Sequence, residues 1–179
     1  MMYIAKIIFH KLLGWKISGN FSADVPKTVI IVLPHTSWHD FYIGVFTRKI
    51  LNIPIQYVAK KELFDSPLGW YFKWMGGEPI ERSSKQNKVE QIVQMFDNHD
   101  EFRLAIAPEG TRKKVETWRS GFYYIAHQAK VPITSVAFDY ATKTVKISEP
   151  FMTTGVYEQD LKHLKLFYKG VVGKVPEYT

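Results

Sequence analysis

The stretch Pro-His-Thr-Ser-Trp-His-Asp, residues 34–40, places two residues that can move a proton, His35 and Asp40, five positions apart. A carboxylate that holds the proton on one imidazole nitrogen leaves the other nitrogen free to act as a general base. His and Asp also cap helices and form turns, so the pair alone leaves a structural interpretation open. His39 is a second histidine beside Asp40 and competes with His35 for the same carboxylate.

Two further polar clusters contain arginine and glycine. The first is Gly-Gly-Glu-Pro-Ile-Glu-Arg, residues 76–82, and the second is Pro-Glu-Gly-Thr-Arg, residues 108–112. Arginine holds a phosphate through two parallel hydrogen bonds, and the glycine at position 110 lets a ligand approach the backbone. The same residues also suit a turn, and either arginine can be a solvated surface charge.

The elements that must position these clusters alternate between strand and helix. The apolar run at 28–33 is typical of a strand that is buried on both faces. Further strands are expected at 55–59, 78–81, 102–107, 131–140 and 144–148, and helices at 40–51, 87–98, 118–130 and 157–168, with two short helices within 60–75. This alternation predicts an α/β fold, a single domain with a mixed, partly parallel sheet flanked by helices. Ligands of such sheets gather at the carboxyl ends of the strands, where the polar clusters are expected to meet.

Composition narrows the classes of function. The 179 residues, 46% of them hydrophobic, are enough for one domain with a sizeable core. The chain has no cysteine, which excludes disulfides, thiolate catalysis and zinc–thiolate sites. Its formal net charge of +7 indicates an anionic partner. The candidates are nucleic acid, a phosphorylated substrate and the surface of an anionic bilayer.

Residues 1–17 have the pattern of an amphipathic basic helix that precedes the domain at 18–179. Apolar residues recur at helical spacing, while lysines and a histidine fall mostly elsewhere; the apolar set is Ile4, Ile7, Ile8, Leu12 and Trp15. The segment is too short and too charged to span a bilayer, and it lacks the small-residue cleavage site of a signal peptide. Its apolar face is expected either to pack on the domain or to lie at a membrane interface.

The four blocks His-x4-Asp, Gly-Gly-x-Pro-Ile-x-Arg, Pro-Glu-Gly-Thr-Arg and Val-Pro-Ile, in this order over residues 28–138, resemble the PlsC-type glycerolipid acyltransferase family. The resemblance implies that His35 is the general base and that Asp40 orients it. It also implies a group that binds the phosphate of the acceptor: Arg82, Glu109, Gly110, Thr111 and Arg112. The Val-Pro-Ile block at 131–133 is implied to be mainly structural and to line the substrate cleft.

The implied reaction moves a fatty acyl group from acyl-CoA or acyl carrier protein to the free hydroxyl of a lysophospholipid, with lysophosphatidate as the default acceptor, in phospholipid biosynthesis. No metal or cofactor and no acyl-enzyme is expected. Backbone amides near 34–37, or the start of the helix near Asp40, are the expected donors to the oxyanion. The protein is expected in the cytoplasm, peripheral at the inner face of the cytoplasmic membrane, with an anionic membrane surface rather than nucleic acid as its charged partner.

Three alternatives stay open. A hydrolase, either a thioesterase or a lysophospholipase, would use His35 to activate water in place of the lipid hydroxyl. The second alternative is an acyltransferase with the same chemistry but a different acceptor. The third is a lipid-binding module without activity, in which the His35–Asp40 pair has a structural role. The sequence also departs from the family pattern: Pro34 stands where the family often has Asn, and Ala107 replaces a position that is often aromatic and is expected to widen the cleft.

Overall fold

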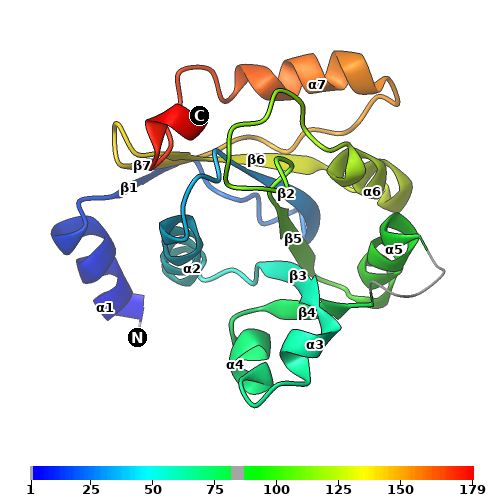
Figure 1. Cartoon of the computed structure of the whole chain (residues 1–179), viewed down its shortest axis with the longest axis horizontal. Helices are drawn as coiled ribbons and strands as arrows, with labels where there is room; N and C mark the ends of the chain where they lie inside the picture. The colour runs from blue at the N-terminus through cyan, green and yellow to red at the C-terminus, as the bar shows by residue number, and fades with distance from the viewer. Residues whose placement is uncertain (1, 82–86) are drawn as a thin grey trace.

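The computed structural model describes residues 2–81 and 87–179, in which seven strands form one sheet (Figure 1). The strand order is β1-β7-β6-β2-β5-β3-β4, and every pairing is parallel except that of β6 with β7. The strands are β1 (Lys16–Ser18), β2 (Lys27–Leu33), β3 (Gln56–Lys60), β4 (Gly77–Ile80), β5 (Phe102–Ile106), β6 (Ile133–Asp139) and β7 (Thr144–Ile147). The predicted α/β class with a mixed, partly parallel sheet is confirmed, and most of the strand pairings are parallel.

Helices connect the strands much as the periodicity predicts. They are α1 (Met2–Lys6), which continues into the π-helical turns η1 (Ile7–Leu12), then α2 (His39–Leu51), α3 (Lys61–Phe64), α4 (Gly69–Trp74), α5 (Lys88–Asn98), α6 (Gly121–Ala129) and α7 (Tyr157–Leu166), followed by the 3-10 turn η2 (Pro176–Tyr178). The predicted break within 60–75 lies between α3 and α4, at the turn that contains Ser66 and Pro67.

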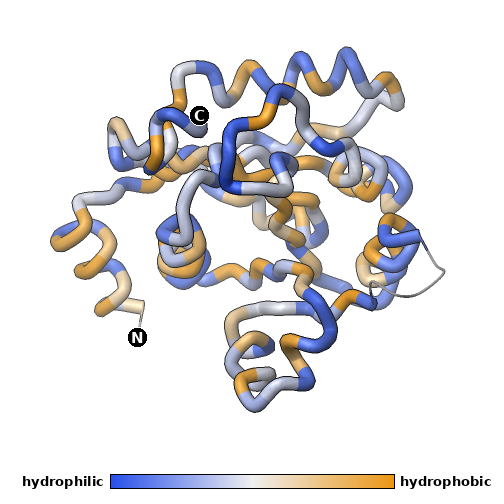
Figure 2. Tube along the Cα trace, in the orientation of Figure 1, coloured by the Kyte–Doolittle hydropathy of each residue, from blue (hydrophilic) through white to orange (hydrophobic). Residues whose placement is uncertain are grey.

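The two faces of the sheet bury two separate cores. Along β2, Val29, Ile31 and Leu33 belong to the core shared with α5, α6 and α7, whereas Ile30 belongs to the core shared with η1 and α2. Successive side chains of a strand point to opposite faces, and this strand is covered on both, so its run of apolar residues is continuous. Figure 2 shows this hydrophobic centre, with hydrophilic residues on the outer helices and loops. The polar segment that follows β2 is thereby fixed on a rigid, central strand.

The amino-terminal helix is shorter than the expected 1–17, because Lys16–Ser18 forms β1 and pairs with β7. One side of the helix packs on the domain: Phe9 is fully buried, and its ring lies 6.3 Å from that of Phe46 in α2. Ile4 and Ile7 on the other side are exposed. Among residues 2–81 and 87–179 we find no helix long and apolar enough to span a membrane.

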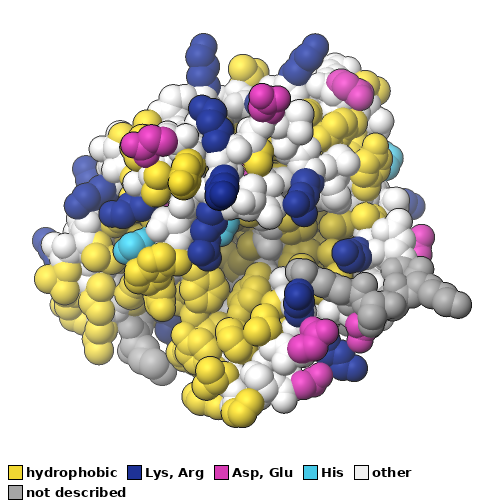
Figure 3. Space-filling view, viewed as in Figure 1, with side chains coloured by type: hydrophobic (Ala, Val, Ile, Leu, Met, Phe, Trp, Pro, Cys, Tyr) yellow, Lys and Arg dark blue, Asp and Glu magenta, His cyan; other side chains and the backbone are white. Residues whose placement is uncertain are grey.

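A second exposed apolar segment lies in α4, where the side chains of Trp70 and Trp74 are 69% and 66% exposed. Hydrophobic side chains gather on the same side of the molecule, over α1 and α4 (Figure 3). The guanidinium of Arg48 ties α2 to this region, because its Nη1 donates to the carbonyls of Ile55 (2.9 Å) and Met75 (2.7 Å). Two apolar segments far apart in the sequence thus share one face.

Candidate active site

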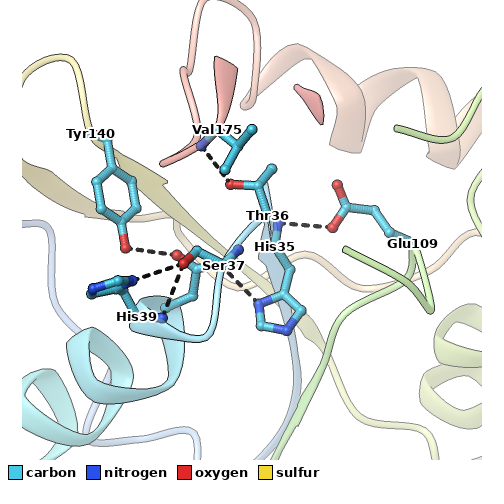
Figure 4. Close-up of polar contacts among 8 residues, drawn as sticks. His35, Thr36, Ser37, His39, Glu109, Tyr140 and Val175 are labelled. Carbon is cyan, nitrogen blue, oxygen red and sulfur yellow. Dashed lines mark hydrogen bonds and ion pairs between the residues drawn. The ribbon is translucent and has the colours of Figure 1, made fainter. Parts of the chain in front are cut away.

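The segment after β2 brings His35 and Asp40 together. Figure 4 shows His35 and Ser37 of this segment, with Glu109 and Tyr140 on either side. The Nδ1 atom of His35 lies 3.1 Å from Oδ2 of Asp40, which occupies the first turn of α2. The Asp40 side chain is 1% exposed, whereas that of His35 is 26% exposed. A buried carboxylate on Nδ1 leaves Nε2 for a reacting group, which is the arrangement that the spacing predicts.

Three donors fix the carboxylate of Asp40. Its Oδ2 accepts the backbone N–H of Ser37 at 2.8 Å as well as the His35 imidazole, and its Oδ1 accepts the Tyr140 hydroxyl at 2.7 Å. Burial, reinforced by the nearby Asp40 carboxylate, raises the pKa of the Tyr140 phenol far above its ordinary value of 10.0, so the phenol keeps the proton that it donates. The sequence did not indicate a role for Tyr140. It is the last residue of an expected strand and lies 100 positions from Asp40, so no local pattern connects the two.

His39 does not share this carboxylate. Its Nδ1 lies 2.9 Å from the Ser37 hydroxyl, and its ring packs against that of Trp38 with the centroids 4.0 Å apart. The Asp40 carboxylate contacts the imidazole of His35 instead. Of the two competing histidines, His35 therefore has the geometry of a base with an orienting acid.

Glu109 holds the backbone of the same segment. Its Oε2 accepts the N–H of His35 at 2.8 Å, and its side chain is buried. Burial raises the pKa of the Glu109 carboxyl, while the hydrogen bond from His35 opposes the rise. Two of the amides expected to stabilise an oxyanion, those of His35 and Ser37, are therefore engaged by Glu109 and Asp40. The amide at the start of α2 is engaged too, since the Asp40 N–H donates to the Ser37 carbonyl.

The rest of the Glu-Gly-Thr-Arg block forms the loop after β5, the strand paired with β2. Gly110 has φ +65°, a left-handed conformation that favours glycine. Thr111 and Arg112 are exposed. Contact of Glu109, Gly110, Thr111 and Arg112 with a phosphate stays a prediction, and Arg82 lies outside the described residues.

An apolar cavity of about 280 Å³ opens beside the His35–Asp40 pair, between α2 and the sheet. Gly44 on α2 faces it, with Ala107 after β5 and Phe138 on β6. Arg48 also lines it, eight residues along α2 from Asp40, or roughly 12 Å. Arg48 borders a second, polar hollow as well, together with Ile55 and Gln56.

The Val-Pro-Ile block does not line this cavity, which corrects one expectation. Val131 and Ile133 are buried in the core on the other side of the sheet, and the Pro132 carbonyl accepts the Thr28 hydroxyl at 2.9 Å. The block stands at the start of β6, whereas ligands collect where such strands end. Its role here is structural.

A comparison with protein-family models matches residues 16–139, more than half of the chain, to the family described as Acyltransferase. The chain belongs to this acyltransferase family. The match spans β1 to β6 and includes the His35–Asp40 pair and the loop at 109–112. It confirms the resemblance drawn from the four sequence blocks.

Two curated relatives carry the name 1-acyl-sn-glycerol-3-phosphate acyltransferase. The one from Bacillus subtilis is 26% identical over 137 residues, which are 74% of this chain and 66% of the relative. The one from Saccharomyces cerevisiae is 27% identical over 118 residues, 62% of this chain and 38% of the relative. The chain thus spans less than two thirds of the length of either relative.

Among solved structures, the fold is similar to that of the 1-acyl-sn-glycerophosphate acyltransferase PlsC from Thermotoga maritima. The TM-score is 0.66 at 20% sequence identity, and the similarity covers 94% of this chain and 75% of the other. At this identity the likeness establishes the shared fold of the acyltransferase family.

Proposed function

We propose that this protein transfers a fatty acyl group from a thioester donor, acyl-CoA or acyl carrier protein, to the free hydroxyl of a lysophospholipid. The observation that carries the proposal is the placement of the His35–Asp40 pair at the side of an apolar cavity. A proton acceptor beside a cavity lined by hydrocarbon suits a substrate that joins a reactive polar group to a long apolar chain. The names of the curated relatives support 1-acyl-glycerol-3-phosphate as the acceptor.

In the proposed reaction, Nε2 of His35 takes the proton from the acceptor hydroxyl as its oxygen attacks the thioester carbonyl. The resulting tetrahedral intermediate collapses, the carbon–sulfur bond breaks, and the imidazolium returns its proton to the leaving thiolate. Asp40, buried and 3.1 Å from Nδ1, stabilises the imidazolium between the two proton transfers. No side chain of the protein becomes acylated.

In this proposal, the acyl chain of the donor and the phosphate of the acceptor lie in different parts of the site. The acyl chain of the thioester occupies the apolar cavity, where Gly44 and Ala107 leave room between α2 and the sheet. The phosphate of the acceptor lies near the loop at 109–112, on the β5 side of His35. Exposed Arg112 supplies the charge there, and the family resemblance adds Arg82.

The exposed apolar face over α1 and α4 supports peripheral attachment to an anionic bilayer, in keeping with the formal charge of +7. Because Phe9 and Trp15 are buried, deleting residues 1–17 would damage the core; substitution of exposed residues is the better test. Replacing Ile4 and Ile7 with Ser should reduce sedimentation with vesicles that contain anionic lipid, at unchanged unfolding temperature. Unchanged sedimentation would contradict the attachment.

Product analysis by lipid mass spectrometry tests the activity. Acyl-CoA or acyl carrier protein with lysophosphatidate should yield the diacyl phosphate lipid, and replacing His35 with Ala should abolish it while leaving the fold intact. The matched variant, His39→Ala, should retain much of the kcat, because His39 bonds to Ser37 and not to Asp40. Free fatty acid from acyl-CoA alone would indicate a hydrolase instead, and neither product would indicate a lipid-binding module.

A further inference from the structure

A hollow of about 810 Å³ lies beside the active site, on the β6 side of the sheet. We call it the β6-side hollow. Its walls come from the start of α2, the turn between β6 and β7, and the segment after α7; the residues that matter here are Trp38, His39, Tyr42, Tyr140, Lys143 and Lys174. Tyr140 lines it and also donates its hydroxyl proton to Asp40, so the hollow adjoins the catalytic pair.

One wall of the hollow is aromatic. The Trp38 side chain is 55% exposed, and its ring is braced by His39, with the centroids 4.0 Å apart, and by Tyr42 at 5.4 Å with the planes 85° apart. An indole that is fixed by neighbouring rings and still largely exposed is a surface on which a planar heterocycle can stack. A simple hydrocarbon ligand would not need this geometry.

Two ammonium groups complete the hollow. The Nζ of Lys143 donates to the Leu13 carbonyl at 3.1 Å, and the Nζ of Lys174 lies 5.7 Å from the centroid of the Tyr140 ring. The lining residues include no Asp or Glu. The carboxylate of nearby Asp139 is already bound, by Lys146 at 2.9 Å and by the Thr142 hydroxyl at 2.8 Å. The hollow is therefore cationic, and its charge favours a phosphorylated ligand.

We infer that the β6-side hollow binds the adenosine 3′,5′-bisphosphate portion of coenzyme A. The purine stacks on Trp38, and the phosphates meet Lys143 and Lys174. This inference rests on the proposed acyl transfer, which places the acyl chain in the apolar cavity and the acceptor phosphate at the loop after β5. The strand order then leaves the β6 side of His35 for the leaving part of the donor. The inference selects coenzyme A over acyl carrier protein as the donor.

Calorimetric titration with adenosine 3′,5′-bisphosphate tests the hollow without any turnover. We expect the native protein to bind this nucleotide, and the double variant Lys143→Gln/Lys174→Gln to bind it about tenfold more weakly, because two exposed charge contacts are lost. Lys162→Gln is the matched control, since Lys162 is an exposed lysine on α7 outside the hollow. Absence of nucleotide binding by the native protein, or equal binding by the double variant, would overturn the inference.

Steady-state kinetics supply the second arm. The double variant should raise the KM for acyl-CoA about tenfold and leave the KM for acyl-pantetheine, which lacks the nucleotide, unchanged. A rise in the KM for lysophosphatidate instead would assign the hollow to the acceptor, and a rise for acyl carrier protein alone would assign it to that protein; both results overturn the inference. If the native protein transfers no acyl group, the proposed function fails, while the titration still decides whether the nucleotide binds.

Discussion

Replacing Tyr140 with Phe removes a single hydroxyl and tests whether the support of Asp40 is part of the catalytic machinery. The hydroxyl donates a 2.7 Å hydrogen bond to Oδ1 of a carboxylate that is 1% exposed. A hydrogen bond to a buried charged group contributes about 1.5–3 kcal/mol. The variant should lose that much stability. If the whole loss is expressed in the transition state, kcat/KM falls about 10- to 100-fold.

Two measurements separate the structural part of this effect from the catalytic part. Urea unfolding gives the change in stability, and kcat and KM measured separately give the effect on the base. With one donor fewer, Asp40 is held less firmly against the imidazole of His35, so kcat should fall while the KM values for donor and acceptor stay native. Tyr124→Phe is the control, because Tyr124 is 45% exposed and stacks on Tyr157 away from this site.

A Tyr140→Phe protein with native kcat and native kcat/KM would refute the reasoning. A loss of stability without either kinetic change would leave Tyr140 a purely structural residue. The hydrogen bond from the Ser37 N–H and the contact with His35 would then suffice to hold Asp40.

Three other substitutions test separate parts of the structure. Gly44→Ala should stabilise α2 by about 0.5–1 kcal/mol in thermal unfolding, and should shift the acyl preference toward shorter chains, because the added Cβ contacts Phe138 at 3.7 Å inside the cavity. A preference for longer chains would contradict the cavity assignment. Gly110→Ala should lose about 1 kcal/mol or more in urea unfolding together with most activity, since alanine is strained at φ +65° in the loop that carries Glu109; native stability would argue against this strain. Asp160→Asn tests a buried carboxyl with a lowered pKa. Burial alone would raise the pKa of Asp160, but the hydrogen bonds that it accepts from Thr154 and Tyr123 lower it below its ordinary value. Its contribution is fully present above the ordinary pKa of about 3.9 and is lost as pH falls through the lowered pKa of the folded protein. The difference between the native and variant stabilities should therefore shrink as pH falls from 7 into that acid range; a constant difference would contradict the shift.

Local pattern was enough to predict most of the elements and the contact between His35 and Asp40. The unbroken apolar run of β2 and the three-and-four spacing in α5 are properties of neighbouring residues, and both elements lie within a residue of their expected bounds. His35 and Asp40 meet because only one turn of chain separates them, so a short offset sets their distance. In these cases no distant contact is needed to determine the geometry.

The remaining parts of the site depend on contacts between distant residues. Glu109 is 74 positions from His35, and Tyr140 is 100 positions from Asp40, so the sheet must assemble before either contact exists. The pairing of β1 with β7 also joins residues that are distant in the sequence. The local pattern of apolar residues could not show this pairing, so the predicted first helix was too long. The apolar cavity depends on how α2 packs on the sheet. Gly44 lines it without a side chain to fill the space, and helical periodicity does not predict such an unfilled volume.

Arg48 places a charged side chain in the wall of the apolar cavity. Its guanidinium donates to the carbonyls of Ile55 and Met75, and the residue also lines a polar hollow. In the proposed function, an acyl chain that reaches Arg48 brings hydrocarbon against a cation, which is unfavourable. Under that proposal the accepted chain length depends on Arg48, a residue separate from the His35–Asp40 pair that performs the transfer.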